Sequence, residues 1–238
     1  MKRSKNAGFT LIELAIVLVV IGLIIAAVLK GEDLIQNARM LNFVTNPVQK
    51  AQVGAMAYYD RTGQFPSATT SGTTTNGALY QMYQTGIDGV LDINNPFIKG
   101  SDQLGIALTT ITDTQGAKAT YPAIVIVPVS VSTTGYTGST SWTTSAIGYA
   151  NYLKARIDGN NDWTTGSVRF ITSITTVPTF KTLQSEIGSS TPKTSAYDGY
   201  YATAQSAALT GTNAANTFAT PSTSKSGVLV FFYNQQPH

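Results

Sequence analysis

The hydrophobic and polar positions divide this chain into an uninterrupted apolar segment near its start and a long remainder of mixed character. In residues 9–29 the only polar or charged side chains are those of Thr10 and Glu13. About 20 apolar residues are enough to cross a bilayer as a helix. The preceding residues 1–8 include three basic residues, Lys2, Arg3 and Lys5, and no acidic residue. Positively charged flanks of a membrane helix stay in the cytoplasm. The pattern therefore predicts a transmembrane helix with its N-terminus inside and the bulk of the chain outside.

The helical pattern continues beyond the apolar segment. Between Leu34 and Tyr59, apolar residues recur at steps of three and four, which is typical of an amphipathic helix. One helix is therefore predicted from about residue 9 to about residue 61, ending before Gly63 and Pro66. Pro47 lies inside it and is predicted to kink or break it, because proline removes one backbone hydrogen bond.

The rest of the chain has the patterns of strands, short helices and turns. Runs rich in Val, Ile, Phe and Thr predict strands at 104–111, 123–131, 167–174 and 227–233. Helical spacing predicts a helix at 146–157 and, more weakly, at 196–209. Thr-, Ser- and Gly-rich stretches predict flexible loops at 67–76 and 132–144.

These elements predict an α+β fold, in which a long N-terminal helix packs on a mostly antiparallel sheet. The expected organisation is a leader at 1–8, a transmembrane helix at 9–29, its amphipathic continuation at 30–65, and a globular head at 66–238.

Composition narrows the classes of function. The chain has 15 Lys and Arg against 12 Asp and Glu, but three of the basic residues lie in the leader, so the remainder is close to neutral. Charge therefore gives no support to a nucleic-acid partner. Cysteine is absent, which excludes a disulfide and a cysteine nucleophile. The only histidine is the last residue, His238, so a catalytic triad would depend on a chain end, and we predict no enzyme activity.

The string Gly8-Phe9-Thr10-Leu11-Ile12-Glu13-Leu14 combines a glycine, an apolar helix start and one acid at a fixed spacing. It resembles the processing site of type IV prepilins and of type II secretion pseudopilins. The resemblance implies cleavage between Gly8 and Phe9 by a prepilin peptidase and N-methylation of Phe9. It also implies that Glu13 pairs with the N-terminal amine of a neighbouring subunit. Such a pair is physically reasonable, because a lone buried charge is costly and two opposite charges attract strongly in apolar surroundings.

Other interpretations of this segment stay open. A simple signal anchor or a cleaved signal peptide would explain its apolar character, and Ala26-Ala27 is a weak small-residue cleavage site. A solvated acid near the lipid headgroups is the alternative role for Glu13. A simple anchor, however, has no reason to place Glu at that position.

The resemblance predicts a structural subunit of a type IV pilus-like filament that polymerises through its N-terminal helix. The alternatives are a type II secretion pseudopilin, a minor or tip pilin in adhesion or DNA uptake, and an anchored binding module that never polymerises. The expected partners are further copies or other pilins, the prepilin peptidase, an assembly platform and the inner membrane. The precursor is expected in the inner membrane, and the product in a periplasm-spanning or extracellular filament.

One turn has the residue types of a metal site. Asp158, Asn160 and Asp162 alternate as in the first half of a calcium loop, where oxygen ligands suit a hard cation. The later glycine and the closing glutamate of such a loop are missing, and Asp, Asn and Gly are also typical of plain turns. Some type II pseudopilins bind calcium in their heads. No other cofactor is predicted.

Overall fold

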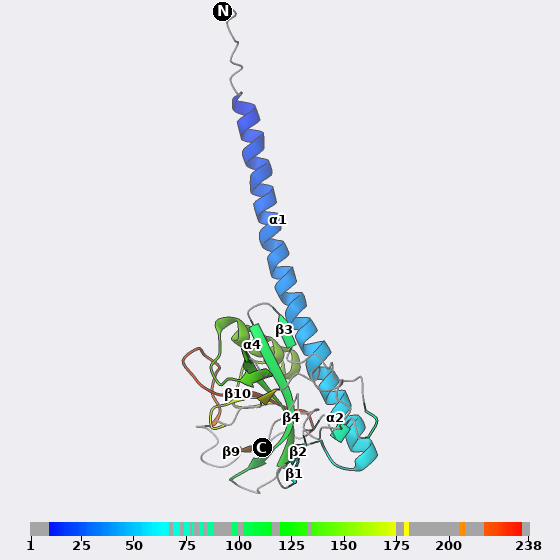
Figure 1. The fold of residues 1–238 in the computed structure, drawn as a ribbon. Helices are drawn as coiled ribbons and strands as arrows, with labels where there is room; N and C mark the ends of the chain where they lie inside the picture. The colour runs from blue at the N-terminus through cyan, green and yellow to red at the C-terminus, as the bar shows by residue number, and fades with distance from the viewer. Residues whose placement is uncertain are drawn as a thin grey trace, which may run out of the picture. The chain divides into compact units, whose positions relative to one another are not determined.

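The computed structural model describes residues 10–66, 69–71, 74–76, 78, 81–82, 85–87, 97–99, 102–115, 120–132, 135–174, 179–180, 205–207 and 217–234. A long helix is followed by an antiparallel sheet, as the α+β prediction required (Figure 1). The chain divides into two compact units, Met1–Leu41 and Asn42–His238. The division falls inside the long helical stretch, between Leu41 and Asn42.

The N-terminal helical stretch is continuous, as predicted. It consists of α1 (Leu11–Phe43), the π-helical turn η1 (Val44–Val48) and α2 (Gln49–Thr62). It ends at Gly63, whose left-handed backbone (φ 72°) lets its N–H donate to the carbonyl of Tyr59 at 2.7 Å. Glycine takes this conformation without steric cost, which explains why the helix ends there.

Pro47 interrupts the α-helix without breaking the helical path. It lies within η1, which replaces the α-helical hydrogen-bond pattern over Val44–Val48. In an α-helix the proline ring clashes with the carbonyl four residues earlier, and the missing N–H leaves that carbonyl unpaired. A wider π-helical turn relieves both problems. The prediction of a disturbance at Pro47 is therefore confirmed, in the form of a π-helical turn.

Burial along the helix begins at the second unit. Phe43 and Val44 are fully buried, as are Val48, Ala51 and Ala55. The Phe43 ring meets the ring of Tyr149 edge to face, with centroids 5.4 Å apart. Tyr149 belongs to α4 (Thr144–Asp158), the helix that the sequence predicted at 146–157. The last third of the long helix is thus part of the core of the head.

The head contains a mainly antiparallel sheet in the order β3-β4-β5-β10-β7. The long strands confirm the predicted runs, and β3 is an additional edge strand. The bounds are β3 Phe97–Lys99, β4 Asp102–Asp113, β5 Thr120–Ser132, β7 Val168–Ile171 and β10 Val228–Phe232.

The last strand of the chain is central in this sheet. Strand β10 lies between β5 and β7 and is buried over its whole length. On one face, alternate residues of β5 and β10 join a single apolar cluster that includes Val125, Val230 and Phe232. Helix α4 contacts β7 and β4. A strand buried on both faces explains the continuous apolar run Val-Leu-Val-Phe-Phe in the sequence.

Three local predictions are wrong. Part of the weak helix at 196–209 is instead β9 (Gln205–Ala207), which pairs in parallel with β4. The loop predicted at 67–76 contains the paired strands β1 (Thr69–Ser71) and β2 (Thr74–Asn76). The loop predicted at 132–144 contains β6 (Gly135–Gly138), which pairs with β5 and with β8 (Thr179–Phe180). Threonine, which favours strands, is the main residue of β1 and β2, and these two strands pair with each other. Strands β6 and β9 instead pair with β5 and β4 of the main sheet.

Gly227, just before β10, has no room for a side chain. A Cβ atom there would lie 2.7 Å from a ring carbon of Phe170 and 2.8 Å from the carbonyl oxygen of Ile171. We therefore expect Gly227→Ala to lower the free energy of unfolding by about 1–3 kcal/mol, as overpacking of a core does. Urea unfolding followed by circular dichroism measures this change.

Gly31→Ala is the matched control for that variant. Gly31 lies in α1 with nothing within 4 Å of a Cβ atom, so this change should not lower stability. Equal midpoints for Gly227→Ala and the wild type would contradict the packing described at β10.

Candidate assembly site

Thr10 and Glu13 form a reciprocal pair at the start of α1. The Thr10 N–H and the Thr10 hydroxyl each donate to Oε2 of Glu13 at 2.9 Å. In return, the Glu13 N–H donates to Oγ1 of Thr10 at 3.3 Å. This arrangement is a capping box, in which two backbone N–H groups without helical partners are satisfied by side chains. The Thr-x-x-Glu spacing was visible in the sequence, but only the structure shows that Glu13 also caps its own helix.

The capping box leaves part of the Glu13 carboxylate available. Oxygen Oε2 accepts both hydrogen bonds from Thr10, and Oε1 makes none with any residue from 10 onward that the structure describes. Gly8 and Phe9 lie outside the described residues, so cleavage between them and methylation of Phe9 stay predictions. Glu13 is held at the end of the helix where the processed N-terminus would begin.

The apolar part of α1 is exposed along its length. Leu11, Leu18 and Leu23 are 91%, 61% and 67% exposed. Among the described residues, one helix, Leu11–Thr62, is long and apolar enough to cross a membrane. Apolar surface of this extent is stable only in lipid or against other apolar helices. The first unit therefore requires a bilayer or partner helices.

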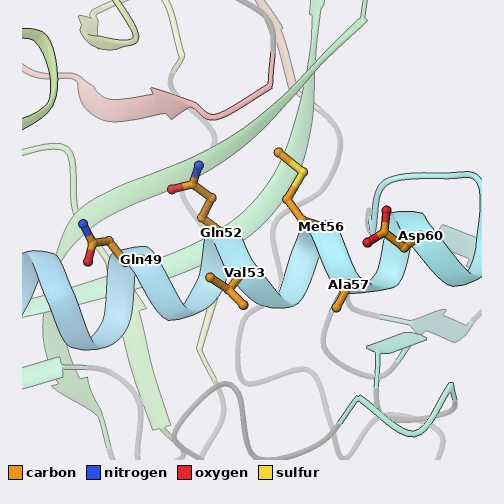
Figure 2. A pocket seen from close by; sticks show the side chains of 6 residues that line it. All are labelled: Gln49, Gln52, Val53, Met56, Ala57 and Asp60. Carbon is orange, nitrogen blue, oxygen red and sulfur yellow. The ribbon is translucent and has the colours of Figure 1, made fainter.

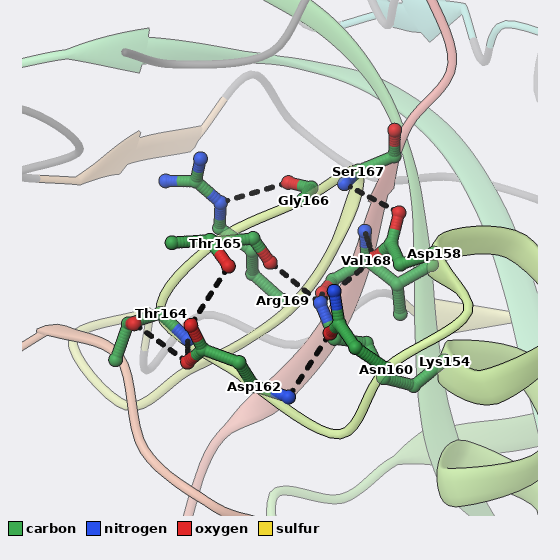
Figure 3. Close-up of polar contacts among 10 residues, drawn as sticks. All are labelled: Lys154, Asp158, Asn160, Asp162, Thr164, Thr165, Gly166, Ser167, Val168 and Arg169. Atoms are coloured by element: carbon green, nitrogen blue, oxygen red, sulfur yellow. Dashed lines mark hydrogen bonds and ion pairs between the residues drawn. The ribbon is translucent and has the colours of Figure 1, made fainter.

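The turn after α4 is built around a buried ion pair, which the sequence did not reveal. The Lys154 side chain is fully buried, and its Nζ lies 2.7 Å from Oδ2 of Asp158. Nζ also donates to the carbonyls of Thr165 and Val168 (Figure 3). Asp158 in turn accepts from the backbone N–H groups of Ser167 at 2.8 Å and Val168 at 2.9 Å. The pair thus joins the end of α4 to the start of β7.

The residues of the calcium-like turn have separate partners. Oδ1 of Asn160 accepts from the N–H of Asp162. The Asp162 carboxylate accepts from the hydroxyls of Thr164 and Thr165, on the opposite side of the turn from Asp158 (Figure 3). Among the described residues, no group of three or more His, Cys, Asp or Glu side chains is placed to hold a metal ion. Calcium at Asp158, Asn160 and Asp162 stays a prediction that these contacts do not test.

The hydrogen bonds to Asp162 make one contribution to stability dependent on pH. The Thr164 hydroxyl, the Thr164 N–H and the Thr165 hydroxyl lower the pKa of Asp162 from 3.8 to about 2. A carboxylate whose pKa is lower in the folded state stabilises the fold above its unfolded pKa and loses this effect as the pH falls. We therefore expect the melting temperature of the wild type to exceed that of Asp162→Ala by more at pH 7 than at pH 2. A difference that stays constant across this range would contradict the role of these bonds.

A hollow of about 490 Å³ runs along α2. Its described lining comes from successive turns of this helix (Figure 2): Gln49, Gln52, Val53, Met56, Ala57 and Asp60. These side chains include one carboxylate and no nucleophile or base to pair with it. We assign no chemistry to this hollow.

Comparison with known proteins found a match for the N-terminal segment alone. A family model described as the prokaryotic N-terminal methylation motif matches residues 3–29. No curated protein and no solved structure matches the chain.

The matched motif is the signal of type IV pilin and pseudopilin precursors. The chain thus carries the N-terminal signal of a type IV pilin or pseudopilin precursor, and its long apolar helix followed by an antiparallel sheet is a pilin-like arrangement. The motif implies processing by a prepilin peptidase and assembly with pilins in general, and it fits a membrane-anchored precursor. Proteins that carry it are generally structural.

Proposed function

We propose that this protein is a structural subunit of a type IV pilus-like filament, cleaved after Gly8 and polymerised through α1. The observation that carries the proposal is that α1 is apolar and exposed from Leu11 to Leu29 and that Glu13 is the single charged residue in this range. The methylation motif covers this segment. The helix cap needs only an acceptor at this position, which glutamine also supplies, whereas a helix that leaves lipid for a bundle can use the negative charge of Glu13.

Cleavage changes the charges at the end of the helix. It removes Lys2, Arg3 and Lys5 and creates a new amine at Phe9. That amine becomes the only cation near Glu13, and an unpaired charge in apolar surroundings is unfavourable by several kcal/mol. In the proposed filament, Oε1 of Glu13 binds the Phe9 amine of the neighbouring copy while Oε2 continues to accept from Thr10. Each new copy is then aligned by one charge pair.

The proposal is tested by separating sheared surface material from cells and analysing both for polymers of this chain. A pilus subunit is expected as a polymer in the sheared material. Polymer in the cell fraction alone would contradict a surface pilus and indicate a secretion pseudopilus. Monomer in both fractions, at normal expression, would contradict polymerisation and leave an anchored module.

A further inference from the structure

The part of α1 that follows the apolar segment carries charges of both signs. Lys30, Glu32, Asp33 and Arg39 are all exposed on an uninterrupted α-helix. None of the four forms an ion pair with another described residue of the chain. Four exposed charges within ten residues of helix are therefore available to another molecule.

These charges are divided between two opposite faces. Successive residues of an α-helix are rotated by about 100°. Asp33 therefore lies about 60° from Lys30, whereas Glu32 and Arg39 lie about 200° and 180° from Lys30. One face carries Lys30 and Asp33, and the opposite face carries Glu32 and Arg39. Each face has one positive and one negative charge.

An apolar stripe lies between the two charged faces. Leu34, Ile35 and Leu41 are 70%, 54% and 42% exposed. Together with Ala38, these residues lie at rotations of about 20° to 140° around the helix axis, measured from Lys30. An apolar seam flanked by charges is the pattern by which neighbouring helices of a bundle select partner and register. This segment is therefore suited to pack beside parallel copies of itself.

The spacing of the charges selects one displacement between parallel copies. Lys30 is level with Glu32 of a neighbour when that neighbour is displaced by two residues, and Asp33 is level with Arg39 at a displacement of six. A displacement of four residues leaves each pair about 3 Å from level, since the helix rises about 1.5 Å per residue. Long side chains span such an offset. Without displacement, Asp33 and the neighbour's Arg39 differ in height along the helix axis by about 9 Å. A displacement of four residues in the opposite direction gives height differences of about 9 Å for Lys30 with Glu32 and about 15 Å for Asp33 with Arg39.

We propose that Lys30 and Asp33 of one copy bind Glu32 and Arg39 of the next copy, with parallel helices displaced by about four residues, or about 6 Å. This inference rests on the proposed function and specifies the contact between subunits. A pair between Glu13 and the Phe9 amine of a neighbour also requires a displacement of four residues. The direction is the same when the copy that supplies Glu32 and Arg39 also supplies Glu13. Because the two faces are different, the contact is heterologous and repeats without closing, as a filament requires.

The test is charge reversal with rescue, measured as the polymer fraction of full-length chain at equal expression and processing. Lys30→Glu alone and Glu32→Lys alone place like charges together and are expected to reduce polymer at least about tenfold. The double variant Lys30→Glu/Glu32→Lys restores opposite charges and should recover polymer to within about twofold of the wild type. Lys30→Glu/Asp33→Lys has the wild-type net charge but creates two like-charge contacts, so it should not polymerise.

Two further variants make the outcomes distinguishable. Lys50→Glu reverses an exposed charge outside the proposed contact and should leave polymer unchanged. Glu13→Ala reports on the proposed function. Normal polymer from the single reversals, with polymer lost in Glu13→Ala, would overturn this contact and leave the proposed function standing. A double swap that is processed normally but polymerises no better than its single variants would also overturn it. Normal polymer from Glu13→Ala would overturn the proposed function and this contact with it.

Discussion

The Glu13→Ala variant is expected to be cleaved and anchored normally, but its polymer fraction should be at least about 100-fold lower than that of the wild type. Removing one partner of a buried charge pair is unfavourable by about 3–5 kcal/mol, because the other charge stays unpaired. Here the partner left behind is the N-terminal amine of the neighbouring copy. The polymer fraction of cells with equal amounts of processed protein measures the effect. Wild-type polymer levels in this variant would contradict assembly through Glu13.

The capping box provides a sharper control for that prediction. Glutamine also serves at this position of a capping box, because its carbonyl oxygen accepts from the N–H and hydroxyl of Thr10. Glu13→Gln therefore keeps the helix cap and removes the charge. If the charge sets assembly, Gln and Ala should both abolish polymer. Full polymer with Gln and none with Ala would show that Glu13 acts through its hydrogen bonds and that its charge does not set assembly.

Lys154→Met is expected to destabilise the head by about 3–5 kcal/mol. Methionine fills a similar volume, so the loss is mainly electrostatic. The Asp158 carboxylate stays largely buried without its cation, and the carbonyls of Thr165 and Val168 lose their donor. Both costs arise in the folded state only. Chemical unfolding of the full chain in detergent, followed by tryptophan fluorescence, measures the effect, and Trp163 near Lys154 is a local probe.

Lys225→Met is the control for the buried lysine. Lys225 is exposed, so the same change of residue type should alter stability by less than about 0.5 kcal/mol. Similar unfolding midpoints for Lys154→Met and Lys225→Met would contradict a structural role for the buried pair.

The strongly patterned elements could be predicted from the sequence. The long helix, the main strands and α4 all follow from periodicity over many residues, and Gly63 and Pro47 indicated where the helix ends and where it is disturbed. The short strands could not be predicted, because three or four residues are too few to show a pattern, and some of them also depend on strands from distant parts of the chain. Strand β9, for example, is specified by the adjacent β4 and not by its own residues.

The candidate site was only partly predictable. Glu13 is conspicuous because it is the single charge of an apolar segment. Lys154 is not conspicuous, because in the sequence it has the spacing of an ordinary solvated i, i+4 pair with Asp158. Its burial depends on β7 and the turn before it, which come from later in the chain. The same packing binds Asp158 to Lys154, a role that the metal-like spacing with Asn160 and Asp162 does not indicate.

The central claim is that α1 becomes an assembly helix when the leader is removed. Mass spectrometry of the N-terminal peptide from the membrane fraction and from sheared filaments tests it most directly. The account predicts a peptide that begins at Phe9 and carries one added methyl group on its amine. An uncut N-terminus, or a cut after the apolar segment near Ala27, would contradict it.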